Sequence, residues 1–305
     1  MSFQIASIAK FNNVLPKELR NPWIRTGILL TATILIYHSV MMGLYRSWFN
    51  NHYYYHGFLI PVISIYIVFR NRDRLRKTER NTHPYGIILA ILGIVIFLFA
   101  GFFYGSFFLS STSMLIFLMG GVLFFFGKEY LKLLSFPILF LVFMIPMPEF
   151  AFNSLIGPLQ LTAASIGEFL LQCLRIPVHR EGIYLYLEPV TIEVAKSCSA
   201  MHSLIALSAL SVIVAYVIVD SFRKKIIIVA SSIPIAILAN AFRLVLLILL
   251  ILWMGEGVLD SFFHPLSGKL FFLSALSVLA LEALFLNRLG RFQEKQAGLH
   301  SWQRR

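Results

Sequence analysis

The sequence predicts an all-α polytopic membrane protein, a bundle of about eight transmembrane helices. Of its 305 residues, 58% are hydrophobic and 13% are charged, whereas soluble domains contain about 25% charged residues. Apolar runs of roughly 17–25 residues, the length of a membrane-spanning helix, recur along the whole chain. Because lipid offers no hydrogen-bonding partner to an open backbone, such runs fold as helices.

The apolar runs set the order of the predicted elements. A basic tail at 1–25 precedes a membrane domain at 26–287, and a second basic tail at 288–305 follows it. The predicted spans are residues 27–45, 57–69, 85–103, 107–126, 133–145, 201–219, 226–253 and 269–286. No small-residue cleavage site follows the first run, so we interpret it as a retained anchor. A short turn at Tyr104-Gly-Ser predicts that the third and fourth spans form a helical hairpin.

Residues 150–198 depart from this pattern. Within 155–174, polar residues interrupt the apolar run at helical spacing, which predicts one amphipathic helix on the membrane surface or packed against the bundle. The alternating stretch 175–194 contains a turn signal at Glu181-Gly182. This stretch predicts a small outward-facing hairpin.

The net charge of +12 comes from Lys and Arg clusters that lie between apolar runs. Such clusters are typical of cytoplasmic loops, so topology explains the charge and we expect no nucleic-acid partner. With both termini in the cytoplasm, eight spans place every basic cluster on that side. Counting 155–174 as a span would move the later clusters outside, which favours the amphipathic helix. We therefore expect a multi-pass protein in contact with membrane lipids, with 146–200 and 254–268 facing outward.

Cys198 is the candidate nucleophile. It follows the strand-like segment that ends at Val194, lies two residues after Lys196 and precedes the span that begins at Met201. A helix N-terminus and a nearby cation both favour the thiolate, which is the nucleophilic form of cysteine. One alternative is a small buried residue without chemistry, and another is a disulfide with Cys173.

Two residues on the following spans complete a candidate catalytic set. Arg243 lies roughly 15 Å inside the seventh span, where a guanidinium is costly unless it faces the bundle interior. His264 lies at the outward start of the eighth span, and histidine transfers protons near neutral pH. A fixed arginine also stabilises an oxyanion, so the three residues suffice for thiol acyl transfer. The structural alternative for Arg243 is an ion pair with Glu168 or Asp260.

Two further residues support this set. Asn240 shares a helical face with Arg243, and His202 lies one helical turn from Cys198, which makes it an alternative base to His264. No His, Cys, Asp and Glu pattern has the spacing of metal ligands, so we expect no metal and no cofactor.

Short fragments along the spans occur in a defined order. They are His56–Pro61, Phe136-Pro137, Met144–Pro148, Ile176–Val178, Arg180–Gly182, Glu193-Val-Ala, Cys198-Ser199, Asn240-Ala-Phe-Arg243 and His264. In this order they resemble the exosortase/archaeosortase family of membrane-embedded cysteine transpeptidases, over about residues 27–287. One position differs: Ala200 stands where the family usually has glycine. Alanine is tolerated there only if the backbone torsions are ordinary.

The resemblance implies that Cys198 is the nucleophile, that Arg243 assists catalysis and that His264 is the acid and base, with Glu193 in support. It implies exported protein substrates with a C-terminal signal, made of a short motif (often Pro-Glu-Pro, as in PEP-CTERM proteins), a transmembrane helix and a basic tail. It also implies an association with exopolysaccharide production and a bacterial inner-membrane enzyme whose active site faces the periplasm. The residues leave two other functions open: a transporter or flippase that uses Arg243, and a scaffold for polysaccharide export.

Overall fold

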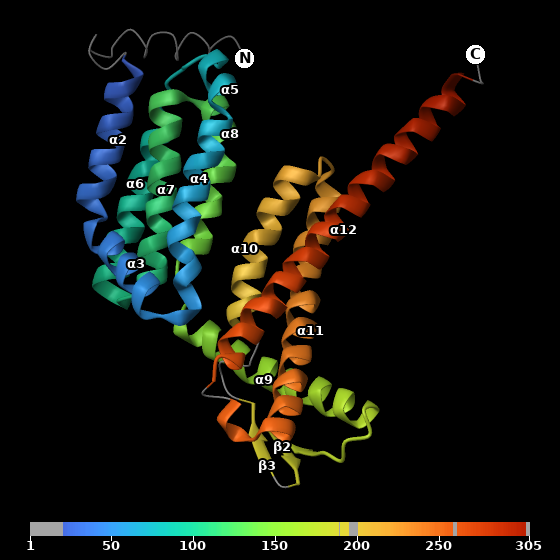
Figure 1. Cartoon of the computed structure of the whole chain (residues 1–305). Helices are drawn as coiled ribbons and strands as arrows, with labels where there is room; N and C mark the ends of the chain where they lie inside the picture. The colour runs from blue at the N-terminus through green and yellow to red at the C-terminus, as the bar shows by residue number, and fades with distance from the viewer. Residues whose placement is uncertain (1–20, 189, 195–200, 259–260, 303–305) are drawn as a thin grey trace. The chain divides into compact units, whose positions relative to one another are not determined.

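The computed structural model of the chain is predominantly helical (Figure 1). It describes residues 21–188, 190–194, 201–258 and 261–302, with the backbone alone at 52, 103, 104, 202, 256, 264 and 290–302. The chain divides into two compact units, Met1–Glu149 and Phe150–Arg305.

The first unit is built from helices and short helical turns. They are α2 (Pro22–Ile36), α3 (His38–Asn50), η2 (His52–Phe58), α4 (Leu59–Arg70), α5 (Arg72–Lys77), α6 (Tyr85–Phe99), η3 (Ala100–Tyr104), α7 (Phe107–Phe126), α8 (Lys128–Phe140) and η4 (Leu141–Met144). Helix α7 packs against α2, α6 and α8, so it is the central helix of this unit (Figure 1).

The predicted helical hairpin of the third and fourth spans is present as α6 and α7. Gly105 makes the turn with a φ of 55°, and the Ser106 side chain accepts a hydrogen bond from the Leu109 N–H at 3.3 Å. The two helices pack closely, because a Cβ on Gly93 would lie 2.8 Å from the backbone nitrogen of Phe117. Small residues at such crossings are how membrane helices approach each other.

The predicted first span is two helices rather than one. Helices α2 and α3 meet at Tyr37 with a bend of 73°. The Tyr37 side chain is fully buried, and its ring contacts Phe97 and Phe117. Its hydroxyl accepts a hydrogen bond from Ser113 Oγ at 3.4 Å. The bend therefore occurs where one side chain is held by α6 and α7, although the apolar run continues through it.

The second unit combines helices with one small sheet. Its elements are α9 (Glu149–Cys173), β1 (His179–Glu181), β2 (Tyr184–Leu187), β3 (Val190–Glu193), α10 (Met201–Ile218), α11 (Phe222–Met254), η6 (Glu256–Val258) and α12 (Phe263–Trp302). Helices α10, α11 and α12 pack around an apolar cluster that includes Leu207, Ala236 and Leu279.

The sheet has three antiparallel strands in the order β1-β2-β3, where the sequence predicts a two-stranded hairpin. The predicted turn at Gly182 is present with a φ of 62°. A second reversal after Leu187 adds β3 to the edge of β2. Leu185 is paired with Ile192, and both pack against α9 and α11 in one apolar cluster. The third strand thus completes the apolar face that packs against the helices. The alternation within each single strand does not predict this third strand.

Helix α9 begins at Glu149, earlier than the predicted start at residue 155. In Figure 1 it runs across α10 and α11 rather than alongside them. Its buried residues recur every three or four positions: Ile156, Gln160, Ala163, Ala164, Gly167 and Leu171. This single buried face is the pattern expected of an amphipathic helix that packs against other elements.

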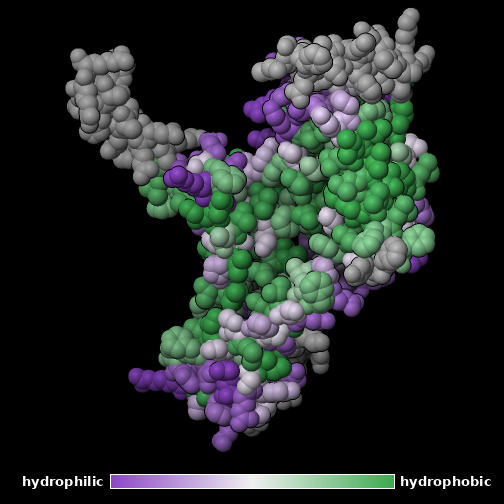
Figure 2. All heavy atoms as spheres, turned by 180° about the vertical axis from the view of Figure 1, so that it is seen from behind, coloured by the Kyte–Doolittle hydropathy of each residue, from purple (hydrophilic) through white to green (hydrophobic). Residues whose placement is uncertain are grey.

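Among the described residues, five helices are long and apolar enough to cross a membrane, or six if the bent pair α2–α3 counts as one span. The structure does not confirm the predicted count of eight, because α4 and α8 contain only 12 and 13 residues. Helix α9 also passes this test of length and composition. The prediction of a polytopic helical membrane protein fits. Figure 2 shows hydrophobic residues over the helical surfaces and hydrophilic residues gathered over the sheet.

Candidate active site

Arg243 lies on α11, about 16 Å along the helix from its last residue, Met254. Its side chain is half-buried and reaches the neighbouring helix, because Nε donates a hydrogen bond to Ser267 Oγ on α12 at 3.4 Å. Ser267 is only 3% exposed. The arginine that the sequence places deep in a span is therefore directed at another helix of the same unit.

The guanidinium of Arg243 lies beside a glycine of α12. A Cβ built on Gly268 would be 3.5 Å from Arg243 Cζ and 3.7 Å from both Nε and Nη2. The guanidinium thus occupies the space next to the bare backbone at this position. Ser267 and Gly268 together form the surface of α12 that Arg243 contacts.

Apolar packing holds the turns of α11 on both sides of Arg243. Ala236 belongs to the cluster shared with α10 and α12, whereas Leu244 and Ile248 belong to the cluster shared with α9 and the sheet. Asn240, one turn before Arg243, is 4% exposed. The two polar residues therefore share an interior face, as their spacing predicts.

His264 lies in the first turn of α12, which begins at Phe263. Ser267 and Gly268 follow it by three and four residues, so all three positions share one face of the helix. Along the helix axis, His264 is about 4.5 Å from Ser267. The backbone of α12 therefore places His264 one turn from the residues that contact Arg243.

Cys198 lies outside the described residues, but the residues on both sides of its segment are described. Val194 and Met201 are 0% and 1% exposed, and Met201 begins α10 at the predicted residue. His202 is the second residue of α10, and its predicted place one turn from Cys198 stays a prediction.

Gln160 is a polar contact that sequence reasoning missed. It lies on the buried face of α9, is 7% exposed, and donates from Nε2 to the Val194 carbonyl at 2.8 Å. The Val194 N–H in turn donates to the Ile183 carbonyl at 2.9 Å. The backbone that leads into the Cys198 segment is thus held from two sides. The sequence feature that could have indicated this contact is an amide side chain among the apolar residues of the buried face of α9.

Replacing Gln160 with methionine is expected to destabilise the protein by about 1–3 kcal/mol, because the Val194 carbonyl stays buried without its partner. The measurement is thermal unfolding of the full chain in detergent. Gln172→Met is the matched control, since Gln172 lies on the same helix and is exposed. Equal melting temperatures for the two variants would contradict a holding role for Gln160.

Three other described residues considered from the sequence have surroundings of their own: Glu193, Glu168 and Cys173. Glu193 ends β3 on the exposed face of the sheet, paired with Tyr184, whereas the opposite face packs against α11. Glu168, one partner considered for Arg243, instead pairs with Arg180 at 2.9 Å. Asp260, the other, lies outside the described residues. Cys173 is exposed and free.

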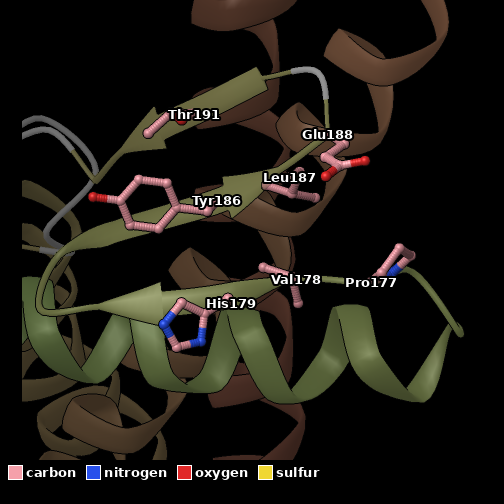
Figure 3. Close-up of a pocket in the computed structure, with 7 residues that line it drawn as sticks. All are labelled: Pro177, Val178, His179, Tyr186, Leu187, Glu188 and Thr191. Carbon is pink, nitrogen blue, oxygen red and sulfur yellow. The ribbon is translucent and has the colours of Figure 1, made fainter.

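A pocket of about 720 Å³ opens on the exposed face of the sheet (Figure 3). His179, Tyr186 and Thr191 are direct cross-strand neighbours there, one on each strand. The imidazole of His179 lies 3.6 Å from the Glu181 carboxylate. These side chains are exposed, and Arg243 is not among the described residues that line the pocket. The contact between α11 and α12 is therefore the better candidate for catalysis.

The contact between α11 and α12 lies within a region that one family model covers. The model described as transmembrane exosortase (Exosortase_EpsH) matches residues 48–281. The chain belongs to this family. No match was found among curated proteins or among solved structures.

Exosortase membership implies a membrane peptidase or transpeptidase that acts on proteins with sorting signals. The match begins in α3 and ends in α12, so it extends over both units. Every predicted site residue, from Glu193 to His264, lies within it. Together with the apolar helices, the match identifies the exosortase as a multi-pass membrane protein.

Proposed function

We propose that this exosortase is a cysteine-dependent membrane peptidase or transpeptidase. Its substrates are exported proteins with a C-terminal signal made of a short motif, a transmembrane helix and a basic tail. The observation that carries the proposal is the contact of Arg243 with Ser267 and Gly268, one helical turn from His264. A half-buried guanidinium beside a histidine-bearing helix start is suited to acyl transfer.

The reaction begins when the Cys198 thiolate attacks the scissile carbonyl carbon. The carbonyl oxygen becomes an oxyanion, and Arg243 donates hydrogen bonds to it from a site where lower dielectric strengthens the interaction. Collapse of the tetrahedral intermediate breaks the C–N bond while His264, which has accepted the proton of the Cys198 thiol, gives that proton to the leaving amine. The products are a thioester between Cys198 and the exported protein, and the released C-terminal signal.

A second nucleophile then resolves the thioester. Water yields hydrolysis, and an amine acceptor yields transpeptidation. In both cases His264 removes the proton from the attacking atom, and Cys198 leaves as the thiolate. Arg243 stabilises the second oxyanion as it did the first.

Topology supports an outward-facing site in the bacterial inner membrane. By the positive-inside rule, the basic clusters at 70–80, 128–132 and 223–225 favour a cytoplasmic location for those segments. Helix α11 begins beside the last cluster and carries Arg243 toward its other end. The site then faces the outward side of the membrane, which is the side to which an exported protein is delivered.

The test is direct capture of the thioester. Purified full-length enzyme in detergent, mixed with a signal-bearing protein, is expected to form a covalent complex that hydroxylamine cleaves, because thioesters react readily with this amine. Peptide mass spectrometry should place the bond on Cys198. A bond to Cys173 instead, or cleavage of the substrate with no hydroxylamine-sensitive complex under single-turnover conditions, would refute the proposal.

A further inference from the structure

The geometry points to Ser267 as a positioning residue for Arg243. Ser267 and Gly268 together form the surface of α12 on which the guanidinium rests, which we call the seat of Arg243. This inference rests on the proposed function, because the orientation of Arg243 affects catalysis only if its guanidinium donates hydrogen bonds to the oxyanion. It adds two residues of α12 that the sequence candidates did not include.

The hydrogen bond to Ser267 fixes the inner edge of the guanidinium. Arginine carries five N–H donors in one plane, so holding Nε at Ser267 Oγ restricts the rotation of that plane and the directions of the other donors. Ser267 is 3% exposed. Water therefore has little access to its hydroxyl, and a buried hydroxyl is expected to keep its protein partner.

The glycine sets the distance between the guanidinium and α12. The nearest guanidinium atom would lie 3.5 Å from a Cβ at position 268, which is ordinary van der Waals contact. Alanine therefore just fits beside Arg243. A β-branched side chain would extend further and would push the guanidinium away from the helix.

The seat also relates Arg243 to His264. Positions 264, 267 and 268 lie on one face of α12, so a guanidinium held at the second and third is one turn from the first. An acyl transfer requires the oxyanion donor at the carbonyl oxygen and the proton donor at the leaving nitrogen, both bonded to one reacting carbon. A shift of the guanidinium along α12 would separate them.

The first experiment measures turnover and KM of the Ser267→Ala enzyme with a signal-bearing substrate. We expect kcat to fall about tenfold with KM nearly unchanged, the size of effect expected when a hydrogen bond to a charged group is lost. Ser267→Thr, which keeps the hydroxyl, should recover most of the rate. Ser274→Ala is the matched control, because Ser274 is an exposed serine on the same helix.

A double-mutant cycle separates positioning from simple helix packing. In an Arg243→Ala background, which has no guanidinium to position, the Ser267→Ala change should have no further effect on kcat. An equal loss in both backgrounds would overturn the inference, because Ser267 would then act without Arg243. Wild-type turnover by Ser267→Ala would overturn it as well.

A steric series tests the seat without relying on the hydrogen bond. Gly268→Val is expected to lose far more turnover than Gly268→Ala, and melting temperatures identify variants that fail to fold. Equal turnover of the two folded variants would contradict the seat. These outcomes are separate from the test of the proposed function, which fails if the Cys198→Ala enzyme still processes substrate.

Discussion

Replacing Cys198 with alanine is expected to reduce processing of a signal-bearing protein to background, a loss of at least about a thousandfold. Alanine has no atom that can form the thioester, so the covalent route is closed. The measurement is the cleaved fraction of a co-expressed substrate, normalised to the amount of enzyme in the membrane. Cys198→Ser should also be inactive, because a hydroxyl ionises far less readily than a thiol.

Cys173→Ala is the matched control for this experiment. Cys173 is free and exposed at the last residue of α9, so its replacement should leave processing intact. Loss of processing in both alanine variants would contradict an independent nucleophile and would favour a functional pairing of the two cysteines. Full processing by Cys198→Ala would exclude the proposed chemistry.

Replacing Arg243 with alanine is expected to lower kcat by about 10²–10³-fold with a much smaller effect on KM. The guanidinium is proposed to interact with negative charge that develops only in the transition state, so substrate binding should change little. Arg243→Lys keeps the charge but loses the planar set of donors and should recover only part of the rate. The measurement is steady-state cleavage by the purified enzyme.

Arg288→Ala is the control for loss of one positive charge, because Arg288 is exposed on α12. A melting temperature measured for each variant separates lost catalysis from lost folding. Solute uptake that disappears in Arg243→Ala but persists in Cys198→Ala would instead support a transporter. Normal processing by both the Arg243→Ala and Cys198→Ala enzymes would be the result expected of a scaffold.

The sequence identifies the helical membrane class and several element positions, because these depend on local patterns. The α6–α7 hairpin and the start of α10 at Met201 agree with the predicted residues. Helical spacing also predicts the shared interior face of Asn240 and Arg243. Hydropathy and periodicity are properties of a few consecutive helical turns, so both can be recognised in the sequence alone.

The contacts of the candidate site were beyond such patterns. Ser267 is 24 residues from Arg243, and Gln160 is 34 residues from Val194. For a serine or a glutamine within an apolar helix, the neighbouring sequence does not indicate which distant group is its hydrogen-bond partner. The sequence indicates Arg243 as a candidate because burying its charge is costly. Its partner depends on how α11 packs against α12.

What the sequence by itself determined is therefore the class of fold, the main helices and the residues whose chemistry is costly or reactive. The tertiary structure alone decided the bend at Tyr37, the third strand that carries Glu193, and the seat of Arg243 on α12. Each of these is a contact between segments far apart in the chain. Their free energies depend on shape and distance in space, which hydropathy along the sequence does not encode.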